Sequence, residues 1–263
     1  MMAAKLIAAL LLVVPMWLLT PLDRQIHADR QQLKYGGVRV TREIRDRVGQ
    51  EGAIALLAGF RGIVADFIWI QGHGRWEKKQ WLQQYNDMQM VVFLQPQSTL
   101  FWDVGAWHMA YNIGYAERVD TNNYTVAQGL KRERVWHDRA RDFLKRGIEN
   151  IPHRYDLYFK LGWLYWHKYK DAASAAREFQ RAAQFPTAPT YVGRMYARAV
   201  EQAGDVGAAY EYWRRLWFQD HEKTNHPWPV VEREVKRLEE QLQVPNEQRV
   251  FPKPAATPVS QTP

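Results

Sequence analysis

The main pattern in residues 40–243 is a recurrence of apolar side chains at spacings of three and four, and no stretch alternates apolar and polar residues as a strand would. This spacing gathers the apolar residues on one face of a helix. Helix-breaking residues interrupt the pattern at Gly72, Gly74, Pro96, Gly114, Pro152, Pro186, Pro189, Gly204, Pro227 and Pro229. The pattern therefore predicts an all-α body of helices of roughly 12 to 18 residues.

A landmark with a small residue recurs in three of the predicted helices. It reads Phe101-x3-Gly105, then Tyr158-x2-Leu161-Gly162-x2-Tyr165, then Met195-x-Ala197-x2-Val200. The helix that follows each of them also has a shared landmark, namely Ala140-x3-Leu144, Ala175-x3-Phe179 and Ala209-x3-Trp213-x2-Leu216. A helix hairpin needs a small residue where its helices cross closely and bulky residues that fill the neighbouring groove. Because one hairpin cannot bury both faces, such units are expected in series.

With these landmarks, residues 65–219 resemble a tetratricopeptide-repeat protein. Gly162 and Ala197 are 35 residues apart, close to the family's period of about 34. The resemblance implies a solenoid of helical hairpins whose first helices line a concave face. The unit that starts near Ser98 would carry an insert, residues 116–131, between its helices. The amphipathic stretch 228–243 would cap the solenoid.

The chain is predicted to have four parts. Residues 1–22 are predicted to form a membrane anchor or signal segment, with the apolar run in residues 3–20, and residues 23–59 a helical lead-in. Residues 60–243 are predicted to form the tetratricopeptide-like solenoid with its capping helix. Residues 244–263, with five prolines, are predicted to form a disordered tail.

The N-terminal segment is predicted to be an uncleaved signal-anchor, since residues 17–23 offer no small residues for signal peptidase. A single-pass anchor of this kind places the protein in a membrane. The short tail before the apolar run favours a body on the extracytoplasmic side, whereas the balance of Lys and Arg favours a cytoplasmic body.

Composition narrows the function classes. The net charge of +8 arises from 36 Lys and Arg against 28 Asp and Glu, and the two signs are interspersed without a basic block, so nucleic acid is not a predicted partner. The chain has no cysteine, which excludes disulfides and thiolate chemistry. No nucleophile elbow, phosphate loop, dinucleotide fingerprint or zinc-protease motif is present in the sequence. We therefore predict neither an enzyme nor a cofactor.

The resemblance implies that a partner segment binds the concave face, on side chains that hairpin packing does not need. These are Trp102, Met109, Phe159, Trp163, Trp166, His167, Tyr191, Arg194, Arg198 and Gln202. The predicted groove is aromatic at one end and basic at the other, which suits a peptide with apolar anchors and a carboxylate. The predicted function is a membrane-anchored scaffold for a protein partner, such as a subunit of a membrane assembly.

Carboxylates and histidines suggest alternatives. Asp66 is a single carboxylate in an apolar helix, for which a charge partner on a neighbouring helix is expected. Asp220, His221, Glu222 and His226 lie close in sequence but match no established metal spacing, so no metal site is predicted. The other open function is binding or hydrolysis of a glycan or peptidoglycan fragment, with tryptophans for stacking and Asp66 with Asp103 as a carboxylate pair.

Overall fold

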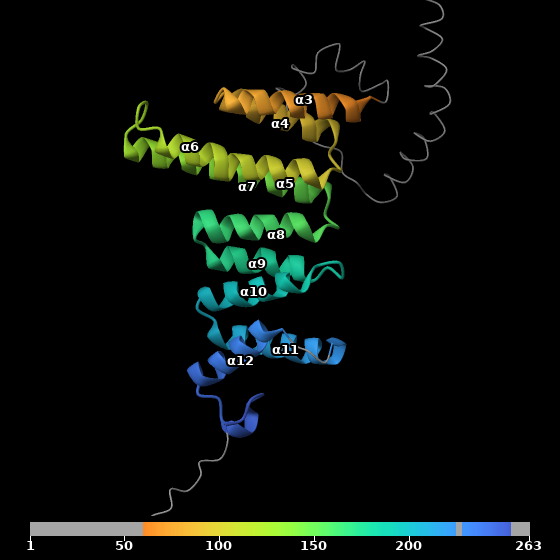
Figure 1. Cartoon of the computed structure of the whole chain (residues 1–263), viewed down its shortest axis with the longest axis vertical. Coiled ribbons are helices and arrows are strands. Elements are labelled where there is room, and N and C mark those ends of the chain that lie inside the picture. The colour runs from red at the N-terminus through yellow and green to blue at the C-terminus, as the bar shows by residue number, and fades with distance from the viewer. Residues whose placement is uncertain (1–59, 225–227, 254–263) are drawn as a thin grey trace, which may run out of the picture. The chain divides into compact units, whose positions relative to one another are not determined.

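The structure, a computed structural model, describes residues 60–224 and 228–253. In this part of the chain all regular structure is helical (Figure 1). The side chains of residues 220, 221, 223 and 224 are not among those described. The chain divides into two compact units between Leu157 and Tyr158, here called unit 1 and unit 2. The prediction of an all-α body is confirmed for the described residues.

Unit 1 begins with two packed helices and continues with a long helical hairpin. Its elements are α3 (Arg61–Glu77), α4 (Trp81–Leu94), α5 (Thr99–Trp107), the π-helical η1 (His108–Ile113), α6 (Gly114–Val119) and α7 (Val126–Asn150). Helix α3 packs on α4, and α7 packs along α5, η1 and α6. The hairpin therefore pairs the run α5–η1–α6 with α7.

Two glycines allow the close approach of α5 and α7. A Cβ atom at Gly105 would lie 2.9 Å from the ring of Phe143, and one at Gly147 would lie 2.9 Å from the indole of Trp102. Trp102 and Phe143 are both fully buried, with ring centroids 4.7 Å apart. The small residue predicted at position 105 thus lies at the helix crossing, as the repeat landmark indicated.

Three predicted interruptions of unit 1 are wrong. Gly72 and Gly74 lie inside α3, and Gly114 lies inside the continuous run α5–η1–α6. Gly72 is buried with Asp87 of α4 beside it, so it allows helix contact instead of ending the helix. The predicted insert, residues 116–131, is mostly helical as well, because α6 and α7 extend into it and only residues 120–125 connect them.

Unit 2 contains two further helical pairs in sequence, followed by one more α-helix. Its elements are α8 (Tyr155–Leu164, which begins in unit 1), the π-helical η2 (Tyr165–Tyr169), α9 (Ala172–Ala183), α10 (Thr190–Gln202), α11 (Val206–Thr224), α12 (Pro229–Gln241) and the short 3-10 helix η3 (Asn246–Gln248). Helix α9 packs on α10, α10 on α11, and α11 on α12. Prolines 96, 152, 186 and 189 and Gly204 all lie between helices, as predicted.

The core of unit 2 also follows the repeat landmark. A Cβ atom at Gly162 would lie 2.7 Å from the ring of Phe179, which is fully buried. Ala197 is likewise fully buried, in a cluster with Trp213 and Val235. Small residues therefore stand at the crossing in both helical pairs.

The prediction of a disordered tail is wrong for residues 244–253, which we call the C-terminal strap. Phe251 packs on Trp217 of α11 with ring centroids 4.8 Å apart, and Val244 and Val250 contact the same core. These three apolar side chains provided too weak a signal in a Pro-rich segment. Residues 254–263 lie outside the described part.

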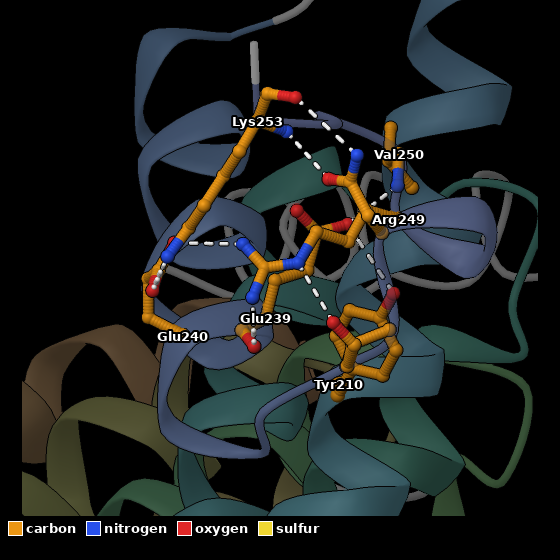
Figure 2. Close-up of polar contacts among 8 residues, drawn as sticks. Tyr210, Glu239, Glu240, Arg249, Val250 and Lys253 are labelled. Atoms are coloured by element: carbon orange, nitrogen blue, oxygen red, sulfur yellow. Dashed lines mark hydrogen bonds and ion pairs between the residues drawn. The ribbon is translucent and has the colours of Figure 1, made fainter. Parts of the chain in front are cut away.

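Polar contacts hold the strap to α12 (Figure 2). Glu239 is only 1% exposed, and its Oε1 accepts hydrogen bonds from the Val250 amide at 2.5 Å and the Tyr210 hydroxyl at 3.3 Å. Arg249 and Lys253 each donate to Glu240 at 2.7 Å. The buried carboxylate thus joins α11, α12 and the strap.

Residues 1–59, which include the predicted anchor and lead-in, lie outside the described part. No helix within residues 60–224 and 228–253 has the length and apolar character needed to span a bilayer.

Candidate partner-binding surface

Three aromatic side chains of unit 2 lie in a row along α8 and η2. Phe159, Trp163 and His167 follow one another at intervals of four residues, which places them on one helical face. Trp163 stacks on His167 with 4.2 Å between ring centroids, and on Phe159 with 6.0 Å. We call this row the aromatic ladder. Its first two rings are half-buried, and His167 is exposed.

Tyr191 extends the row of rings from α8 onto α10. Its ring meets that of Phe159 edge-on, with centroids 5.3 Å apart and 81° between the planes. The side chain is 41% exposed. The ladder and Tyr191 together form an accessible aromatic surface over α8 and α10.

The histidine of the ladder behaves as an aromatic ring without charge. Burial lowers the pKa of His167 below its ordinary value, and the nearby Lys170 and Lys168 lower it further. The imidazole is therefore neutral at neutral pH, which favours its stacking on Trp163.

A local turn fixes the exposed end of the ladder. Helix η2 ends at Lys170, whose φ of 56° is left-handed. Asp171 follows and caps α9, because its Oδ1 accepts a hydrogen bond from the Ser174 amide at 2.9 Å. The Ser174 hydroxyl also donates to Oδ2 at 2.5 Å, and this bond, followed by the one from the amide, lowers the pKa of Asp171.

The arginines of the predicted groove make contacts within unit 2. The Arg194 guanidinium lies 5.3 Å from the ring centroid of Trp228, and Arg198 lies 3.8 Å from the Glu234 carboxylate of α12. Gln202 is exposed at the end of α10. The basic end of the groove stays a prediction; in the structure, α12 places the Glu234 carboxylate near Arg198 of α10.

Two other predicted groove residues are core residues, and a third is half-buried. Trp102 and Met109 of unit 1 are fully buried, and the Trp102 Nε1 donates to the Pro96 carbonyl at 2.8 Å. Trp166 packs on Phe179 with ring centroids 5.9 Å apart. The placement of Trp102 and Met109 on an open face is thus corrected; Gly147 provides the space that buries Trp102.

The carboxylate candidates also differ from expectation. Asp66 is exposed, not buried, because α3 leaves its neighbours Ile63 and Phe67 exposed as well. Asp103 is half-buried on α5. Within residues 60–224 and 228–253 no three His, Asp or Glu side chains form a group that could hold a metal.

A polar cluster in unit 1 was missed by the sequence analysis. His108 of η1 lies beside Trp69 and Trp76 of α3, with ring centroids 6.5 and 6.4 Å apart, and a cavity beside it is also lined by Gln84 and Asp87 of α4. The signal available in the sequence was the presence of polar residues among the apolar residues of α4, and the structure shows several of these polar residues buried. The histidines alone suggested only scattered packing.

The comparisons with known proteins give no family for the chain. No protein-family model matches it, and no curated protein is significantly similar to it. The structure describes an α-helical protein. In its unit 2, consecutive helices pack on one another and carry an aromatic surface.

Proposed function

We propose that the chain is a membrane-anchored scaffold that binds a segment of a protein partner on the aromatic ladder and Tyr191. The observation that carries the proposal is that the rings of the ladder and Tyr191 form one continuous row whose two ends, His167 and Tyr191, are exposed. Aromatic side chains dominate the energy of protein interfaces. Residues 3–20 would provide the anchor.

A tetratricopeptide-like solenoid is the architecture that we propose for this scaffold. It is supported by the consecutive packing of α9 to α12 and by small residues at the helix crossings, Gly162 and Ala197. In such an architecture α8, α10 and α12 are first helices, so the aromatic surface would lie on the concave face.

The character of the bound segment follows from the charges. Because Arg198 already faces Glu234, the aromatic rings provide most of the binding energy, and an apolar or aromatic anchor in the partner matters more than a carboxylate. A sugar is the weaker candidate. Trp163 has Phe159 on one side and His167 on the other, whereas a sugar needs an open ring face for stacking.

The test is capture of a partner by the full-length protein from native membranes in mild detergent, with Trp163→Ala beside the wild type. The matched control is Phe218→Ala, an aromatic side chain of unit 2 that is 48% exposed on α11 and outside the ladder. We expect Trp163→Ala to lose the partner and Phe218→Ala to retain it, with equal helicity by circular dichroism.

The captured protein must then bind directly. The purified partner, or a peptide from it, is titrated against wild type and both variants. Equal affinity for the wild type and Trp163→Ala would refute the proposed surface. Binding of cell-wall oligosaccharides that quenches tryptophan fluorescence would instead support the glycan function.

A further inference from the structure

A small cavity in unit 1 has the chemistry of a binding site. Its volume is about 50 Å³, and its walls come from Trp69 and His73 of α3, Gln84, Asp87 and Met88 of α4, and His108 of η1. One water needs roughly 10–15 Å³ of such volume, so the cavity holds a group larger than a single water. The side chain of His73 is 68% exposed, so the cavity has a route to solvent beside it.

Gln84 provides the group that needs a ligand. The residue is only 3% exposed, and its Oε1 is buried without a hydrogen-bond partner in the described part of the chain. A buried amide oxygen without a donor is unfavourable by about 1–3 kcal/mol. A donor bound in the cavity would remove this cost.

The charges around the cavity favour a cation. Asp87 lies three residues after Gln84, on the same face of α4, and accepts a hydrogen bond from Arg75. At the open side, Glu77 lies 3.8 Å from His73. Among the described residues that line the cavity, Asp87 is the only acid and none is a lysine or arginine.

His108 adds an uncharged aromatic wall. The Asn112 amide nitrogen lies 2.9 Å from His108 Nδ1, and because an amide nitrogen only donates, the ring nitrogen accepts. Burial lowers the pKa of His108, and His73 lowers it further, so the imidazole is neutral at neutral pH. Trp69 also lines the cavity, and the face of an indole ring attracts cations.

We propose that this cavity binds a primary ammonium group, with the Gln84 amide oxygen and the Asp87 carboxylate as acceptors and Trp69 as the aromatic wall. The volume admits the ammonium and one or two methylene groups, as in a small alkylamine or the end of a lysine side chain. A quaternary ammonium has no N–H to donate and is too large. The proposal is independent of the partner surface in unit 2.

Saturation-transfer NMR on the full-length protein in detergent tests the proposal. The probes are methylammonium, n-butylammonium and Nα-acetyl-lysine methylamide, with tetramethylammonium as the negative probe. We expect transfer to the methylene or methyl protons next to the amine. Binding of the alkylamines alone identifies a free amine as the ligand, and binding of the lysine amide identifies a lysine side chain.

Variants show whether the binding occurs in this cavity. Gln84→Met and Gln84→Leu keep the bulk of the side chain but remove its oxygen, and each is expected to weaken amine binding about tenfold. Gln83→Leu changes the adjacent exposed residue and should leave the affinity unchanged. The proposal is overturned if no primary amine binds, if tetramethylammonium binds equally well, or if folded Gln84→Met binds amines like the wild type.

Discussion

Replacing Gly162 by alanine tests whether the close helix crossing in unit 2 requires glycine. The added Cβ would lie 2.7, 2.8 and 3.2 Å from the Cδ1, Cε1 and Cγ atoms of Phe179. Phe179 is fully buried between Phe159 and Trp166, whose ring centroids lie 5.3 and 5.9 Å from its own. The ring therefore has little room to move away from a new methyl group.

The size of the effect is the difference between two terms. Alanine is favoured over glycine inside a helix by about 0.5–1 kcal/mol. Overpacking a filled core costs about 1–3 kcal/mol, and the three short contacts indicate the upper half of that range. Gly162→Ala should therefore lower the free energy of unfolding by about 1–2 kcal/mol.

The assay is urea unfolding followed by circular dichroism, with Gly207→Ala as the control in the same unit. Gly207 lies in the first turn of α11, where the nearest atom to a new Cβ is 3.9 Å away. The control should be neutral or slightly stabilising. If both variants unfold at the same urea concentration, the close crossing does not limit the side chain at position 162, and the reasoning is refuted.

Three further predictions follow from other contacts. Phe251→Ala removes the ring that packs on Trp217 and should speed proteolytic cleavage of the strap several-fold, whereas an unchanged rate would mean that the ring does not hold it. Asp171→Ala should destabilise the protein by about 1 kcal/mol at neutral pH, as for other helix caps. The pKa of Asp171 is lowered in the folded state, so the stabilisation is present above the ordinary value of 3.8 and is lost as pH falls through the folded pKa. The urea unfolding curves of wild type and variant should therefore converge in acid. A difference that stays constant with pH would contradict the cap. Burial raises the pKa of Tyr111 to about 12. In a spectroscopic pH titration, Tyr111→Phe should therefore remove phenolate absorbance that develops near pH 12. Loss of phenolate absorbance that develops near pH 10 would contradict the burial of Tyr111.

The fold class and most helix ends could be predicted because they depend on local signals. Apolar spacing indicated the helices, and the prolines between them mark real ends. The small residues at 105, 162 and 197 also predicted close helix crossings from the sequence alone, because such crossings exclude large side chains. Gly72 and Gly114 were misread since glycine ends a helix in one context and allows contact between helices in another.

The candidate surface could be predicted only in part. Spacing on α8 indicated that Phe159, Trp163 and His167 share a face, and the structure places them in one stack. Whether an aromatic residue is core or surface depends on a partner far away in sequence. Trp102 is buried because Gly147 leaves space for it, and no local pattern reveals that pairing.

The C-terminal strap has a consequence for assembly. A helix that ends a stacked series offers its apolar side to any similar helix, including one from a second copy, so an uncovered end promotes filaments. Here Val244, Val250 and Phe251 cover the core formed by α11 and α12, in the position that a further helix would otherwise take. We therefore expect the strap to hinder end-to-end association of copies, and a fragment of this protein made for interaction studies should extend through Lys253.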